Sequence, residues 1–177
     1  AGRRTLCTAL GAELCVIAIK TDMPEARSAL LAALERAGDP RLGLSTVTAK
    51  YPAGGERQLI ELVFGREVPA GGLPADIGVL CQNVATAAAV ADFCLDGRPL
   101  ISRIVTLTGG GIARPCNIEA RIGTAVADLV ALAGGYADAP ARLIIGGPMM
   151  GIPLPDGALP ICHASNCLIA ATTAELG

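Results

Sequence analysis

A strand, a helix and a second strand follow one another within residues 13–49, and this order constrains the fold of the 177-residue chain more than any other feature. Residues 13–20 are rich in valine and isoleucine, which is typical of a buried strand. A helix is expected from Pro24 to the glycine and proline at residues 38–40, and residues 42–49 alternate like a strand. Strands joined by such a helix lie parallel through a right-handed crossover, so the sequence predicts an α/β fold.

Glycines and polar side chains gather at the starts of the next two expected helices. A turn at residues 51–55 enters a helix at 56–64, and a strand at 78–82 leads into an alanine-rich helix at 84–95. In open α/β sheets, ligands bind at the carboxyl ends of strands, where helix N-termini bring positive partial charge. The candidate binding residues at these two junctions are Lys50, Tyr51, Gly54, Gly55 and Glu56, followed by Arg57, and then Gln82, Asn83 and Thr86.

These residue types suit a ligand that combines a flat heterocycle with an anionic group. Glycines let the backbone approach a ligand closely, and amide side chains both donate to and accept from the edge of a heterocycle. Tyr51 offers a flat stacking face, and Thr86 offers a hydroxyl at a helix start that suits a phosphate. The same glycines and amides also fit ordinary turn and capping roles, and the residue types alone leave both interpretations open.

A second domain is expected after the turn cluster at residues 96–99. Strands at 101–108 and 116–122, joined by a glycine turn at 109–111, precede a helix at 124–133 and a strand at 142–145. A hairpin, a helix and a further strand describe a small β-grasp-like module. The sequence therefore predicts domains at 1–98 and 99–160, with residues 161–177 starting a connection that leads out of the second domain.

Composition and residue inventory exclude several function classes. The chain has 52% hydrophobic and 17% charged residues with a net charge of −2, which excludes intrinsic disorder; it also has no basic run, so no nucleic-acid partner is expected. Its longest apolar stretches are interrupted by polar residues, so no transmembrane segment is expected.

The seven cysteines show no C-x-x-C spacing and are interpreted as free thiols in a reducing compartment; no metal site is expected. The single histidine, His163, has no nucleophilic elbow beside it, so nucleophilic catalysis is not expected.

Several longer motifs resemble the C subunit of the Rnf (Rsx) electron-transport complex. The likeness runs in order from about residue 13 to the end of the chain. The motifs that carry it are residues 50–59 (KYPAGGERQL), 65–78 (GREVPAGGLPADIG), 82–87 (QNVATA), 105–109 (VTLTG), 121–124 (RIGT), 146–151 (GGPMMG) and 166–170 (NCLIA).

The resemblance implies a Rossmann-like FMN-binding α/β domain followed by a soluble-ligand-binding β-grasp domain, related to the NADH- and FMN-binding subunit of respiratory complex I. It implies a protein that binds FMN and transfers electrons between NAD(H) and 4Fe-4S clusters, an NADH:ferredoxin-type oxidoreductase coupled to ion translocation. Its partners would be the other subunits of the complex, on the cytoplasmic side of the bacterial cell membrane. The family's glycine-rich loop would precede residue 1 and its cluster ligands would follow residue 177. The chain is therefore interpreted as a middle fragment that is inactive alone.

The resemblance also assigns roles to candidate residues. Tyr51, Gly54, Gly55 and Glu56 match a flavin-contacting Tyr-x-x-Gly-Glu-Glu element of the complex I relative, with glycine in place of its first glutamate. Gln82, Asn83 and Thr86 match an Asn-Asn-Val-Glu-Thr element, whose first asparagine and glutamate are Gln82 and Ala85 here. Glu56 is the candidate catalytic residue, where flavin and nicotinamide would meet. The alternatives are a cobalamin reductase of related architecture and, for this piece alone, a non-catalytic docking module.

Overall fold

The computed structural model describes residues 2–176 and shows a mixed α/β protein. Contacts within the chain divide it into two compact units, Ala1–Pro99 and Leu100–Gly177. Residues 1 and 177, the outer limits of the expected domains, lie outside the described residues. No helix in the described range is long and apolar enough to span a membrane.

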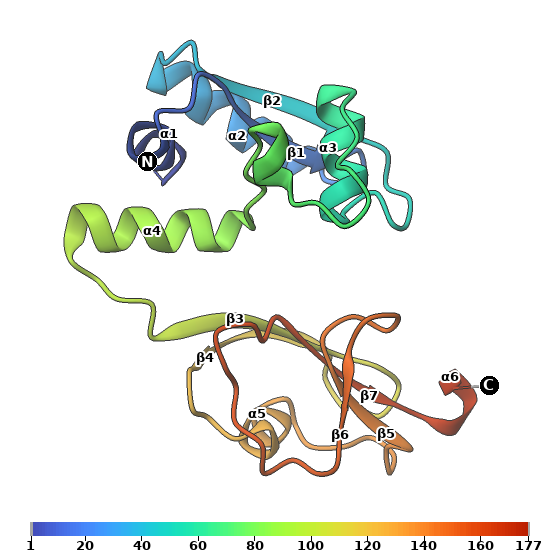
Figure 1. Cartoon of the computed structure of the whole chain (residues 1–177). Coiled ribbons are helices and arrows are strands. Elements are labelled where there is room, and N and C mark those ends of the chain that lie inside the picture. Colours follow the sequence, from blue (N-terminus) through green and yellow to red (C-terminus); the bar gives the residue numbers. More distant parts are fainter. Residues whose placement is uncertain (1, 177) are drawn as a thin grey trace. The chain divides into compact units, whose positions relative to one another are not determined.

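The first unit is organised around two parallel strands, as the sequence predicts. Strand β1 (Cys15–Lys20) pairs with β2 (Leu42–Val47), and helix α2 (Pro24–Ala37) forms the crossover between them (Figure 1). Helix α2 ends at Gly38, whose φ of 56° is in the left-handed region that glycine adopts without strain. The turn into β2 is fixed by a 2.7 Å ion pair between Asp39 and Arg41, which lowers the pKa of Asp39 to about 2.

Three further α-helices belong to this unit. Helix α3 (Glu56–Phe64) has the predicted bounds and packs beside both strands. Helix α1 (Gly2–Leu10), which the sequence did not predict, packs against α4 (Val84–Asp96) (Figure 1). A Cβ atom at Gly2 would overlap the backbone of Ala87, so a glycine permits this close approach of the helices. The buried side chains of the unit include Cys7, Ile17, Ile19, Val47 and Ile60.

The predicted strand at residues 78–82 is wrong. A 3-10 helix, η1 (Pro74–Ile77), occupies the preceding residues and ends at Gly78 with φ 70°. The N–H of Val79 donates back to the carbonyl of Pro74 at 3.0 Å, a turn geometry that is incompatible with an extended strand. The chain then runs without regular structure to α4. The second candidate segment therefore follows a loop and not a sheet strand.

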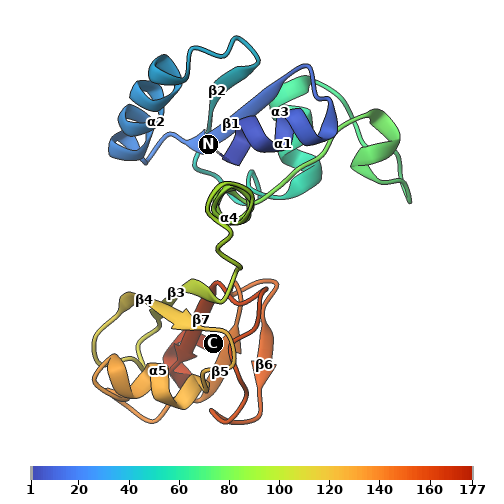
Figure 2. The same ribbon diagram turned by 90° about the vertical axis from the view of Figure 1, so that its left-hand side faces the viewer.

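The second unit contains a mixed five-stranded sheet in the order β4-β3-β7-β5-β6. All neighbours are antiparallel except β3 and β7. Figure 2 shows the sheet with helix α5 beside it. The elements are β3 (Ser102–Thr108), β4 (Cys116–Arg121), α5 (Val126–Leu132), β5 (Arg142–Ile145), β6 (Ile152–Leu154), β7 (Cys167–Ala171) and α6 (Thr173–Leu176).

The structure differs from the prediction that residues 161–177 lead out of the second domain. Strand β7 is the middle strand of the sheet, and Ile161 and Leu168 are fully buried in its core. The glycine turn between β3 and β4 closes over this strand, because the N–H of Gly111 donates to the carbonyl of Ala170 at 2.9 Å. A side chain at Gly109 would overlap that carbonyl. The sheet is therefore complete only when β7 is included.

Burial of β7 generates a stability prediction. We expect Leu168→Ala to lower the free energy of unfolding of the second unit by about 2–5 kcal/mol, because it leaves a cavity at a side chain that is 0% exposed. Leu132→Ala is the matched control, since Leu132 is 65% exposed, and should change stability by less than about 0.5 kcal/mol. Urea unfolding followed by circular dichroism measures both, and equal effects would contradict the central placement of β7.

Candidate functional site

The first candidate segment is a tightly folded turn between β2 and α3. The N–H of Lys50 donates to the carbonyl of Thr48 at 2.8 Å, and the N–H of Ala53 donates to the carbonyl of Lys50 at 2.7 Å. This winding leaves Tyr51 66% exposed at the surface. The turn is thus held by its own backbone hydrogen bonds, while the aromatic face of Tyr51 is accessible to a planar ligand.

Two glycines and an acidic residue lead from this turn into α3. Gly54 is exposed, and Gly55 is the N-cap residue, whose N–H donates to the carbonyl of Pro52 at 2.7 Å. A Cβ atom at Gly55 would lie 3.2 Å from the Pro52 carbonyl oxygen and would overlap the end of the Gln58 side chain. Glu56 is exposed at the first position of α3, where the helix dipole favours a negative charge.

The second candidate segment begins α4. The side-chain oxygen of Asn83 accepts the N–H of Ala85 at 2.9 Å, which caps the helix, and the N–H of Asn83 donates to Oε1 of Gln82 at 3.3 Å. The capping interpretation of Asn83 is therefore confirmed, although its amide NH₂ group is not needed for the cap. Thr86 is half-buried at the third position of α4.

The charge of Glu56, in the first segment, affects Cys81, the residue before Gln82. Burial raises the pKa of the Cys81 thiol, and the negative charge of Glu56 raises it further. Within the described residues no hydrogen bond joins residues 50–56 directly to 82–86. The charge of Glu56 therefore acts on the residue that precedes the second segment, while no hydrogen bond ties the two segments together.

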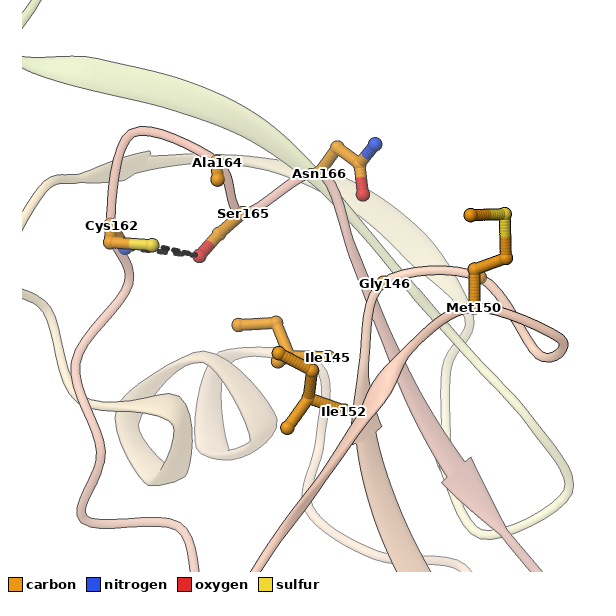
Figure 3. Close-up of a pocket in the computed structure, with 9 residues that line it drawn as sticks. Ile145, Gly146, Met150, Ile152, Cys162, Ala164, Ser165 and Asn166 are labelled. Atoms are coloured by element: carbon orange, nitrogen blue, oxygen red, sulfur yellow. Dashed lines mark hydrogen bonds between the residues drawn. The ribbon is translucent and has the colours of Figure 1, made fainter. Parts of the chain in front are cut away.

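A separate hollow of about 350 Å³ lies on the second unit, and sequence analysis did not predict it (Figure 3). Ile145, Met150 and Ile152 contribute apolar side chains to its lining, and Cys162, Ser165 and Asn166 contribute polar ones. The only sequence signal for this site is a serine three residues after a cysteine. His163 lies between them and is exposed.

The thiol of Cys162 lies within hydrogen-bond distance of the Ser165 hydroxyl. The hydroxyl oxygen of Ser165 accepts the N–H of Cys162 at 3.0 Å, so its own proton is free to point to Sγ, 3.4 Å away (Figure 3). This hydroxyl and the nearby backbone N–H of Ala164 lower the pKa of the Cys162 thiol. Burial instead raises the pKa of Cys167. Among the described residues, no group of three or more His, Cys, Asp and Glu side chains is arranged to hold a metal ion.

Comparisons with known proteins match both units. Residues 1–92 match the family described as the Nuo51 FMN-binding domain, and residues 104–153 match the SLBB domain. A Pseudomonas aeruginosa protein, named as the C subunit of the ion-translocating oxidoreductase complex, is 53% identical over 164 residues, which cover 93% of this chain and 21% of that protein.

Proteins with the same name in two other bacteria are also similar. The Erwinia tasmaniensis protein is 44% identical and the Salmonella enteritidis protein 43% identical, each over 176 residues and 99% of this chain. The matched regions make up 22% and 25% of those two proteins. The chain thus spans between a fifth and a quarter of the length of these curated relatives.

The hydrogen bond between Ser165 and Cys162 predicts a shift in thiol reactivity. We expect Ser165→Ala to move the alkylation profile of Cys162 to higher pH and to slow its alkylation at neutral pH, because the thiolate loses a donor. Iodoacetamide labelling between about pH 6 and 10, read for each cysteine by mass spectrometry, measures this. Ser102→Ala removes a hydroxyl bonded to Glu119 and is the control. An unchanged Cys162 profile in Ser165→Ala would contradict the assignment.

Proposed function

The chain belongs to the family of the C subunit of the ion-translocating oxidoreductase (Rnf) complex and contains a Nuo51 FMN-binding domain, and on this premise we propose that its first unit binds FMN and takes part in electron transfer. The observation that carries the proposal is that the negative charge of Glu56, at the start of α3, helps to raise the pKa of Cys81, just before the segment that leads into α4. We propose that the two candidate segments lie on one side of the first unit, as a single ligand would require.

The residues of both segments fit the chemistry of FMN. An exposed tyrosine ring can stack on the isoalloxazine, and Gly54 and Gly55 let the backbone approach it. The NH₂ group of Asn83 can donate to an acceptor on the ring edge, since only the amide oxygen is used in capping. The Thr86 hydroxyl and the first N–H groups of α4 suit the phosphate, and Lys50 of the first segment would supply a cation for it.

When bound, FMN supplies the capacity to accept two electrons together and to release them singly. The role that we assign to the chain is to bind and orient the ring. Glu56 is the proposed catalytic residue, and its carboxylate at the start of α3 would lie where the nicotinamide of NAD(H) meets the flavin. Gln82 would complete the edge of the site, because its side chain is already held against the backbone of Asn83.

We propose that the two units correspond to a Rossmann-like FMN-binding domain and a soluble-ligand-binding β-grasp domain. Parallel β1 and β2 with the α2 crossover support the first assignment. The SLBB match over residues 104–153, together with a mixed sheet beside α5, supports the second. We place the boundary between them near Pro99.

In the complete protein, we propose electron transfer between NAD(H) and 4Fe-4S clusters, coupled to ion translocation. The names of the relatives support an oxidoreductase complex that moves ions. The cluster ligands and other contacts would come from the remaining length of the protein and from its partners in the complex, on the cytoplasmic side of the cell membrane. We expect residues 1–177 alone to lack the overall activity.

FMN titration tests the proposal. We expect saturable quenching of FMN fluorescence by the complete protein, and an increase in Kd of about tenfold in Tyr51→Ala from lost stacking. Asn83→Asp keeps the capping oxygen but removes the NH₂ donors, so it should also weaken binding without unfolding α4.

Tyr136→Ala is the matched control, since Tyr136 is the other tyrosine of the chain and belongs to the second unit. It should leave the Kd unchanged. Equal Kd values for wild type, Tyr51→Ala and Asn83→Asp would contradict the assigned site. No saturable binding at all would contradict the proposed function and favour the docking-module interpretation.

A further inference from the structure

Arg57, the second residue of α3, binds a distant part of its own chain. Its Nη1 donates to the carbonyls of Val68 and Pro69 at 3.2 and 3.0 Å, and its Nη2 donates to the carbonyl of Gly72 at 2.7 Å. The guanidinium thus gathers three backbone oxygens from a turn that begins eleven residues further along. Such a planar group with fixed donors suits several converging carbonyls better than the compact ammonium of lysine.

The turn that Arg57 holds is itself compact. The N–H of Gly72 donates to the carbonyl of Pro69 at 3.0 Å, and Asp76 accepts the N–H of Leu73 at 2.8 Å. A Cβ atom at Gly72 would lie 3.1 Å from the carboxylate of Asp76, so the chain is tightly folded here. Residues 68–77 therefore form one hydrogen-bonded piece that continues into η1.

This piece determines where the next residues lie. From Gly78 the chain runs without regular structure to Asn83, and the charge of Glu56 acts on the thiol of Cys81 within this segment. Long irregular segments have a large conformational entropy unless hydrogen bonds anchor them, so their ends are poorly positioned when free. Two adjacent residues of α3 thus act on the loop that leads to α4. Glu56 acts through its charge on Cys81, and Arg57 acts through its hydrogen bonds to residues 68–72.

We propose that Arg57 is a positioning residue: its guanidinium clamps the turn at residues 68–72 to the start of α3 and thereby holds residues 81–83 beside Glu56. This inference rests on the proposed function, since the residues held in this way are those assigned to the flavin. Arg57 and Lys50 therefore have different roles. The guanidinium of Arg57 donates hydrogen bonds to three backbone carbonyls, whereas Lys50 is assigned to the ligand. Arg57 therefore acts through the loop and not by contact with a phosphate.

The test compares Arg57→Met and Arg57→Lys in the complete protein. Arg66→Met is the control, since Arg66 is an exposed arginine of the same loop that makes no hydrogen bond to residues 2–176. The first readout is the rate of Cys81 alkylation by iodoacetamide at neutral pH, without flavin. The second readout is the Kd for FMN, and the urea midpoint checks that each variant folds.

We expect Cys81 to react several-fold faster in Arg57→Met, because the thiol loses both its burial and the charge of Glu56, the two causes that raise its pKa. The Kd for FMN should rise about tenfold, and a cooperative urea transition, even with a somewhat lower midpoint, shows that the variant still folds. Arg57→Lys should lie between the wild type and Arg57→Met, and Arg66→Met should match the wild type.

The outcomes separate the clamp from the proposed function. Faster Cys81 alkylation together with weaker FMN binding supports the positioning role. Weaker FMN binding with unchanged Cys81 alkylation overturns it, because Arg57 would then contact the ligand directly. Where the wild type binds FMN, unchanged FMN binding with faster alkylation, or no change in either readout, also overturns the positioning role. Faster alkylation in a protein whose wild type binds no FMN supports the clamp and contradicts the proposed function instead.

Discussion

The parallel pairing of β1 and β2 is the constraint on which the first unit depends. Register pairs Lys20 with Val47, so both strands end at the same edge. Beyond the last pair the N–H of Thr21 donates to the carbonyl of Val47 at 3.0 Å, and the N–H of Ala49 donates to the Thr21 hydroxyl at 3.3 Å. These bonds fix the exit of β2, and the turn that carries Tyr51 follows at once. The position of α3, and of the charged residues that begin it, is a consequence.

Two adjacent residues then build the site from α3. Glu56 contributes a negative charge at a helix start, where it acts on Cys81. Arg57 donates three hydrogen bonds to residues 68–72 of the loop that leads to Cys81. Because the loop has one short helix of its own, η1, its position depends on such tethers more than on packing. The proposed site would therefore depend on local turn hydrogen bonds in residues 48–55 and on the loop that Arg57 holds.

The elements with strong periodic patterns could be predicted from the sequence, and those fixed by distant contacts could not. The bounds of α3 follow from an apolar face between Gly55 and Gly65, and they were predicted residue for residue. Strand β7 was missed because its short apolar run has no periodicity of its own; its place depends on pairing with β3 and β5. The candidate residues were recognised by motif resemblance, whereas the Arg57 clamp joins positions whose proximity no spacing rule reveals. The Cys162 site was missed for the same reason, since a serine three residues away indicates nothing until the turn is folded.

The most direct test of the central claim, that these two segments hold one flavin, is a crystal structure of the complete protein with FMN. The account predicts electron density for the isoalloxazine in contact with both Tyr51 and the segment from Gln82 to Thr86, with the carboxylate of Glu56 at its edge. Density for FMN that touches neither segment, or residues 50–56 lying far from residues 81–86 in the complex, would contradict it.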